Sequence, residues 1–265
     1  MFVWASIGIL FFWIGMVLLG PLLTLTPYDI ELPKILSPPG PSAWLGYDDL
    51  GRPIWDRLVL GARTSLVVAA CVVTLSMWVG TFLGTVTAYL GGWWDHFMVR
   101  VIDIFLAFPG ILLAIAMAGL MGPGIDNVVI ALSTVGWVGF ARLSRAQVLS
   151  LKHREHVQAA VALGAGRIRI VTRHLLPLMV APLIVEATFS IAGVILAEAG
   201  LSFLGLGVQP PAPSWGSMIR DGVRYMLVTP HMVLAPGVSV MLVVLAVNSL
   251  GDRLRDWMDV RTQRV

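Results

Sequence analysis

Long stretches without a charged residue limit the possible folds of this chain more than any other feature. Ser65–Leu90 and Met232–Leu250 contain no charged side chain. A helix needs roughly 20 apolar residues to cross the hydrocarbon core of a bilayer. The chain is 57% hydrophobic and only 12% charged, whereas soluble domains average about 25% charged residues. The sequence therefore predicts an all-α integral membrane protein.

Several stretches approach the length of a membrane-spanning helix. They are Phe2–Leu25, Ser65–Leu90, Ile104–Met121, Asn127–Ala141, Leu175–Ala197 and Met232–Leu250. We predict about six spans, of which Asn127–Ala141 is the shortest. Phe2–Leu25 lacks the basic start and the cleavage site of a secretory signal, so we interpret it as a retained helix. Residues 1–64 then form the first helix and an outer loop, and residues 65–265 form the membrane domain.

Basic residues predict the orientation, because loops rich in Lys and Arg stay in the cytoplasm. The segment between the fourth and fifth predicted spans carries only one acid, Glu155, against Arg142, Arg145, Lys152, Arg154, Arg167, Arg169 and Arg173. We expect this segment, and with six spans both termini, to be cytoplasmic. The outer side then receives Thr26–Thr64, Gly122–Asn127 and Leu201–Pro230.

The segment Arg154–Leu178 is too polar to cross a membrane. Its apolar spacing predicts a short amphipathic helix from Glu155 to Leu163, which Gly164 ends. A second helical run, Arg167–Leu176, leads to a proline that suits the first turn of the next span.

Small side chains on this short helix suggest a docked partner. Ala159 and Ala160 would let another protein surface approach closely. The alternative is that the basic loop only fixes the topology, which explains its charge but not the alanine pair or the glycine.

The spacing AA-x(3)-G-x(9)-H-x-LP resembles the cytoplasmic signature loop of ABC importer permeases, EAA-x(3)-G-x(9)-I-x-LP. The matching residues are Ala159, Ala160, Gly164, Leu176 and Pro177. Gln158 replaces the Glu and His174 replaces the Ile, and both departures resemble the peptide-importer branch of the family. Glu155, nearly one helical turn before Gln158, is the candidate for the missing acid. Three further segments are similar to the same branch, namely Asp48–Leu66, Leu201–Ile219 and Asn248–Arg261.

This resemblance implies a type I ABC importer permease fold, with the coupling helix in a loop at 142–177. It also implies a prokaryotic inner-membrane location, in contact with lipid and not with nucleic acid. The chain would be the smaller permease of a heterodimer, working with cytoplasmic ATPase subunits and an extracytoplasmic binding protein. The expected cargo is di- or oligopeptides, with nickel or haem as alternatives.

The residues expected to couple the chain to an ATPase lie in the signature loop. They are Glu155, Gln158, Ala159, Ala160, Gly164, Arg167 and Pro177. A phosphate-binding loop needs G-x(4)-GK-[ST], but Pro33 precedes Lys34 and Leu151 precedes Lys152. We therefore expect no catalytic residue, metal or cofactor in this chain. ATP and magnesium would be used by the partner ATPases.

Three residues are candidates for the transport pathway or its gate. Glu186 lies in the fifth predicted span, where an acid is costly and by default functional; a protonated or paired Glu that stabilises packing is the alternative. Glu198 lies near the outer end of that span, where a solvated carboxylate is the alternative. Trp215 follows a proline-rich outer segment as an exposed aromatic that contacts the binding protein or lines a gate. An interfacial anchor is the alternative there.

Two further alternatives stay open on the sequence alone. Gly80, Gly84 and Ala88 have the spacing that favours close helix contact, either within the chain or with the second permease. An ATP-independent secondary transporter is the rival function, but it would be expected to show inverted repeats, and we find no convincing repeat.

Overall fold

The computed structural model describes residues 2–41 and 43–262, and every named element in these ranges is a helix. The prediction of an all-α protein is confirmed. The α-helices are α1 (Phe2–Leu19), α2 (Ile54–Leu90), α3 (Gly92–Leu106), α4 (Gly110–Met121), α5 (Ile125–Leu151), α6 (Glu155–Ala162), α7 (Arg167–Ile170), α8 (Leu176–Phe203), α9 (Trp215–Val223) and α10 (His231–Thr262). Two 3₁₀ turns, η1 (Gly20–Leu22) and η2 (Leu32–Lys34), and one π turn, η3 (Val171–Leu175), complete the described elements.

Four of the described helical stretches are long and apolar enough to cross a membrane, judged by length and composition. They are α2, α5, the continuous stretch Arg167–Phe203 that ends in α8, and α10. The pair α3 and α4 would add a fifth span, and α1 is a shorter apolar helix. The structure thus supports four or five full-length spans where we predicted about six.

Several spans begin or end beyond the uncharged stretches. Helix α2 begins at Ile54 instead of Ser65, and α5 continues past Ala141 to Leu151. The added parts of these helices carry arginines that have ion-pair partners: Arg57 pairs with Asp48, and Arg145 with Asp95. Paired charges can continue a helix that hydropathy alone would end. The predicted loop at 142–177 is shorter for the same reason.

The predicted third span is broken. Helices α3 and α4 meet at an angle of 82° instead of forming one helix over Ile104–Met121. The break lies at Ala107–Pro109, just before α4. Proline disfavours a helical conformation in the residue before it and removes a backbone donor.

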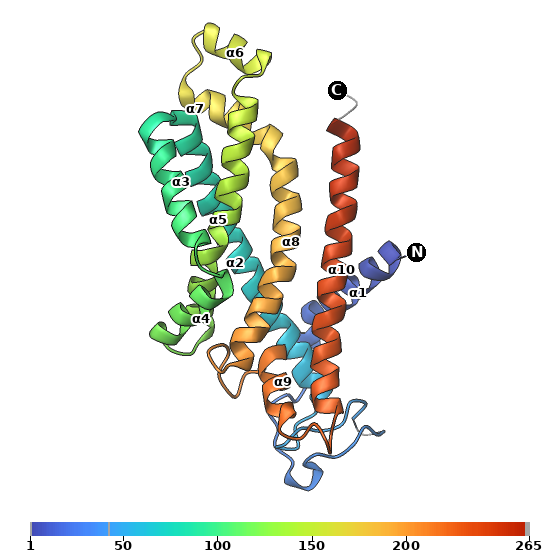
Figure 1. Cartoon of the computed structure of the whole chain (residues 1–265). Helices are drawn as coiled ribbons and strands as arrows, with labels where there is room; N and C mark the ends of the chain where they lie inside the picture. Colours follow the sequence, from blue (N-terminus) through green and yellow to red (C-terminus); the bar gives the residue numbers. More distant parts are fainter. Residues whose placement is uncertain (1, 42, 263–265) are drawn as a thin grey trace.

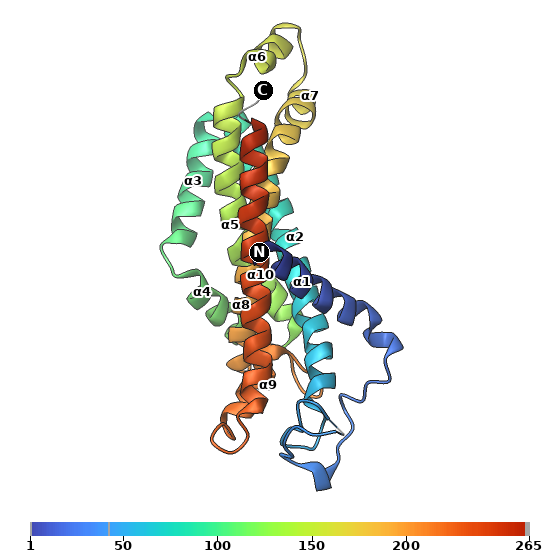
Figure 2. The same cartoon turned by 90° about the vertical axis from the view of Figure 1, so that its right-hand side faces the viewer.

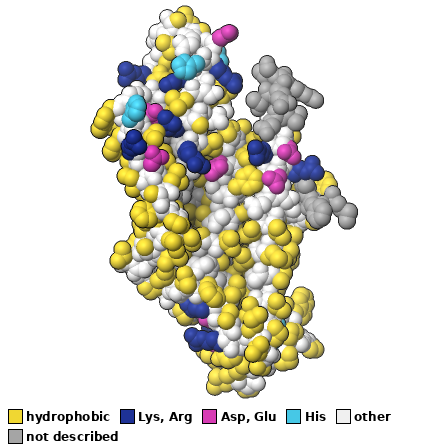
Figure 3. Space-filling model, viewed as in Figure 1, with side chains coloured by type: hydrophobic (Ala, Val, Ile, Leu, Met, Phe, Trp, Pro, Cys, Tyr) yellow, Lys and Arg dark blue, Asp and Glu magenta, His cyan; other side chains and the backbone are white. Residues whose placement is uncertain are grey.

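The long helices run side by side along one axis, with α6 and α7 at one end and α9 at the other (Figures 1 and 2). We call these the α6 end and the α9 end. The last described turns of α10 lie toward the α6 end, whereas α1 begins about half-way along α10. Charged side chains gather toward both ends of the face in Figure 3, and the band between them is largely hydrophobic.

Helix α2 packs against α5 through bare backbone. A Cβ added to Gly80 would meet the carbonyl oxygen of Trp137 and lie 2.7 Å from the Cβ of Phe140. A Cβ added to Gly84 would meet the carbonyl oxygen of Ala141 and lie 2.9 Å from its Cα. The glycine pair therefore serves packing within this chain, which decides between the two alternatives left open by the sequence.

We predict that Gly84→Val destabilises the protein by about 1–3 kcal/mol, the usual cost of overpacking a tight contact. The measurement is the melting temperature of the purified protein in mild detergent. Gly200→Val is the matched control, because a Cβ there meets no atom within 4 Å. Equal melting temperatures for the two variants would contradict the packing assignment.

Candidate functional site

The two short helices at the α6 end form a hairpin with a well-defined glycine turn. The N–H of Gly164 donates to the carbonyl of Val161 at 2.9 Å, and the N–H of Ala165 donates to that of Ala160 at 3.0 Å. This pair of bonds is the Schellman motif, which requires a left-handed residue at the turn. Gly164 supplies it with φ of +80°. The predicted short helix and its glycine end are both confirmed.

The residues expected to couple the chain to an ATPase lie mostly on the surface of this hairpin or at its junction with α8. Ala160 is half-buried; the others are exposed, namely Glu155, Gln158, Ala159, Gly164, Arg167 and Pro177. The side-chain amide of Gln158 donates to the carbonyl of Lys152 at 2.8 Å. Gln158 thus ties the start of the hairpin to the end of α5, a role the sequence did not suggest.

Apolar side chains at the tip of the hairpin were missed by the sequence analysis. Leu163 is 89% exposed and Ile168 is 81% exposed. Val157 anchors the other side of α6, where it is buried against a core cluster that includes Ile170 and Leu175. The sequence contained one signal for this apolar tip: Leu163 and Ile168 lie on either side of the predicted glycine turn. Val157 thus holds the hairpin to the body, whereas Leu163 and Ile168 leave apolar surface exposed.

A π turn joins the hairpin to α8. The N–H of Leu176 donates to the carbonyl of Val171, a spacing one residue wider than in an α-helix. Pro177 follows in the first turn of α8, as predicted, and Leu175 is fully buried. The hairpin is therefore joined to α8 by a continuous helical connection with a buried anchor.

Two of the candidate pathway residues are buried inside the chain. Glu198 is 0% exposed and accepts hydrogen bonds from the hydroxyls of Ser65 and Ser202, both at 2.7 Å. The alternative of a solvated Glu198 is therefore wrong. The carboxylate is stabilised by hydroxyls from α2 and α8, and it ties these helices together near the α9 end.

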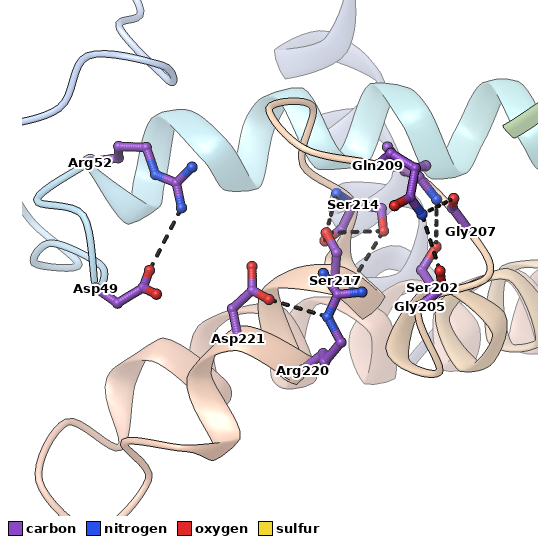
Figure 4. Close-up of polar contacts among 11 residues, drawn as sticks. Asp49, Arg52, Ser202, Gly205, Gly207, Gln209, Ser214, Ser217, Arg220 and Asp221 are labelled. Atoms are coloured by element: carbon purple, nitrogen blue, oxygen red, sulfur yellow. Dashed lines mark hydrogen bonds and ion pairs between the residues drawn. The ribbon is translucent and has the colours of Figure 1, made fainter. Parts of the chain in front are cut away.

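Trp215 is also buried, so the expectation of an exposed aromatic was wrong. Its indole N–H donates to the carbonyl of Leu58 at 3.1 Å, and its ring lies edge-on to Trp13 at 5.3 Å. It is the first residue of α9, which begins with a capping box of Ser214 and Ser217 (Figure 4). Capping positions Trp215 for its long-range contacts, which the local sequence could not show.

A buried charge cluster fixes the segment between η1 and α2, which belongs to the predicted outer loop and is here called the outer segment, to α2. The Asp48 carboxylate accepts from the Arg52 side chain at 2.7 Å and pairs with Arg57 at 3.3 Å. Figure 4 shows the weaker pair between Asp49 and Arg52, 3.6 Å apart, facing the Asp221–Arg220 pair of α9. Burial, with the neighbouring Asp48 carboxylate, raises the pKa of Asp49 above its ordinary value of 3.8.

The third candidate pathway residue, Glu186, is only half-buried. A Cβ added to Gly139 of α5 would lie 3.1 Å from its carboxylate oxygen. No hydrogen bond or ion pair joins the Glu186 carboxylate to another residue in the described ranges.

Comparison with known proteins agrees with this geometry. Residues 80–264 match the family model described as binding-protein-dependent transport system inner membrane component. The chain belongs to this family. Its fold is shared with a chain of the MetNI methionine ABC transporter in an inward-facing crystal form, with a TM-score of 0.63 at 20% identity over 77% of this chain and 97% of that one.

Curated relatives of this permease are named for peptide transport. It is 45% identical to the dipeptide transport system permease protein DppC of Alkalihalophilus pseudofirmus over 241 residues, 91% of this chain and 79% of that protein. It is 41% identical to the glutathione transport system permease protein GsiD of Pectobacterium atrosepticum over 239 residues, 89% of this chain and 79% of that protein. A GsiD from Escherichia coli O157:H7 matches at the same identity and coverage.

We predict that Asp48→Ala destabilises the permease by about 3–5 kcal/mol, because it leaves buried guanidinium groups without their main partner. Arg57 is only 4% exposed. Thermal unfolding in detergent measures the effect. Glu31→Ala, which breaks an exposed pair with Lys34, is the control and should change little. A small effect for Asp48→Ala would mean that the cluster is solvated.

Asp49→Asn is expected to raise the melting temperature at neutral pH. A carboxyl group whose pKa is raised on folding binds its proton more tightly in the folded state. The free energy of unfolding therefore falls as the pH rises from 3.8, the ordinary pKa of the group, through the higher pKa of the folded state. The advantage of Asn should vanish toward pH 4, and an advantage that persists unchanged there would contradict this assignment.

Proposed function

We propose that this permease forms, with a second permease, the membrane pathway of an ATP-driven importer of di- and oligopeptides. Hydrolysis of ATP with magnesium takes place on cytoplasmic ATPase subunits, and an extracytoplasmic binding protein delivers the peptide. The single observation that carries the proposal is the α6–α7 hairpin, which is capped, anchored and apolar at its tip. A surface of this kind is suited to docking, and relatives named for dipeptide and glutathione transport support the cargo.

The α6 end is the cytoplasmic end in this proposal. Basic residues cluster there, which follows the positive-inside rule, and Figure 3 shows Lys, Arg and His side chains over this part of the molecule. The α9 end and the outer segment then face the binding protein. The C-terminal part of α10 lies on the cytoplasmic side, and a cytoplasmic N-terminus stays a prediction.

Leu163→Asp is expected to detach the ATPase subunits without unfolding the permease. The side chain is 89% exposed, so a charge costs the fold little, but it would be buried in a docked complex, where an unpaired carboxylate is costly. The measurement is ATPase activity that copurifies with the tagged permease under mild detergent.

Leu227→Asp is the matched control, because this fully exposed leucine lies in the loop between α9 and α10. It should leave the copurifying ATPase activity unchanged. Equal loss from both variants, or from neither, would contradict docking at the hairpin. A permease that purifies alone and moves solute in liposomes without ATP would favour the secondary-transporter alternative.

The cargo is tested separately with the reconstituted importer and its own binding protein. We expect ATP-dependent accumulation of a labelled dipeptide in liposomes, reduced by excess unlabelled dipeptide. If excess nickel or haem reduced this accumulation and excess unlabelled dipeptide did not, the cargo would be assigned as nickel or haem instead.

A further inference from the structure

A hollow between four membrane helices lies next to the unpaired carboxylate of Glu186. It has a volume of about 260 Å³ and is lined by residues of α2, α4, α5 and α8, among them Ser76, Gly110, Gly136 and Gly193. Drug-sized ligands occupy pockets of about 300–1,000 Å³. The hollow therefore suits one side chain with its adjoining backbone better than a whole oligopeptide.

One face of α8 connects the carboxylate to the hollow. Ser190, Gly193 and Ala197 line the hollow, and Glu186 precedes Ser190 by four residues. Residues at this spacing lie on one face of a helix, one above the other. Glu186 thus lies one helical turn from the hollow, toward the α6 end, where it approaches Gly139 of α5.

One side chain that lines the hollow has a hydroxyl group without a hydrogen-bond partner in the described part of the chain. Ser76 is 2% exposed, and its hydroxyl has no hydrogen-bond partner among the described residues. Gly136 faces it so closely that an added Cβ would lie 2.6 Å from the hydroxyl oxygen. Buried hydroxyls are usually hydrogen-bonded, so an unpaired one that lines a hollow points to a polar ligand.

We propose that the hollow is a transit subsite for the amino-terminal residue of the transported peptide. This inference rests on the proposed function. The peptide ammonium group pairs with the Glu186 carboxylate, and its first side chain enters the hollow. The ammonium group complements a negative charge that has no partner in the described chain, in a part of a membrane helix where an acid is by default functional. Glycines at the wall allow the peptide backbone to approach.

The test uses the complete importer in liposomes with its own binding protein. The probe is a dipeptide with a free amino terminus and photoreactive p-benzoylphenylalanine as its first residue. Illumination during turnover should crosslink it to residues around Ser76 and Gly193, as mapped by mass spectrometry. We expect Glu186→Gln to lower the crosslink yield and peptide uptake by about tenfold, the effect of losing one modest charged interaction.

Gly193→Phe should fill the hollow and abolish the crosslink, while ATP hydrolysis stimulated by the loaded binding protein continues. A Cβ at Gly193 meets no atom within 4 Å, so the variant is expected to fold. Gly8→Phe, at an equally open glycine of α1, is the control and should behave like the wild type.

The outcomes separate this inference from the proposed function. Wild-type vesicles that accumulate no peptide would overturn the proposed function. Vesicles that accumulate peptide but show crosslinks only on the second permease would overturn the subsite alone. Loss of the second permease from purified Glu186→Gln complexes would also overturn it, because the carboxylate would then be an intersubunit ion-pair partner.

Discussion

The backbone contact between α2 and α5 determines where the rest of the molecule lies. Helix α5 leads into the α6–α7 hairpin, and α2 provides the groups to which the α9 end is attached. Helix α2 has 37 residues, about 55 Å at 1.5 Å per residue, whereas the hydrocarbon core is about 30 Å thick. A single helix of this length can hold both ends of the protein in a fixed relation.

The two ends use polar groups in opposite ways. At the α9 end, three buried polar side chains have partners within the chain: Glu198 has hydroxyls, Trp215 a carbonyl, and Asp48 arginines. These contacts join α2, α8, α9 and the outer segment into one unit. At the α6 end the hairpin turns polar and apolar side chains outward. Buried polar contacts within the chain thus distinguish the α9 end, and exposed side chains distinguish the hairpin at the α6 end.

Local signals in the sequence were sufficient to predict the hairpin. Gly164 and Pro177 act through backbone conformation alone, so their roles do not depend on distant residues. The burial of Glu198 and Trp215 could not be predicted in the same way, because it depends on Ser65, Leu58 and Trp13, which are far away in the sequence. Span boundaries failed for a related reason, since the added parts of α2 and α5 carry Arg57 and Arg145, whose charges are paired with Asp48 and Asp95 on other segments. The hollow near Glu186 arises from the packing of four helices, so the sequence of any one helix could not predict it.

The exposed tip of the hairpin also has a consequence for the life of the subunit before assembly. In the proposed orientation, a newly made copy presents Leu163 and Ile168 to the aqueous phase, on either side of the glycine turn of the hairpin. Proteases and chaperones that monitor the cell interior recognise apolar segments of this kind. If the hairpin docks as proposed, the same two side chains would mark an unassembled copy for removal, so that the amount of permease follows the amount of its partners.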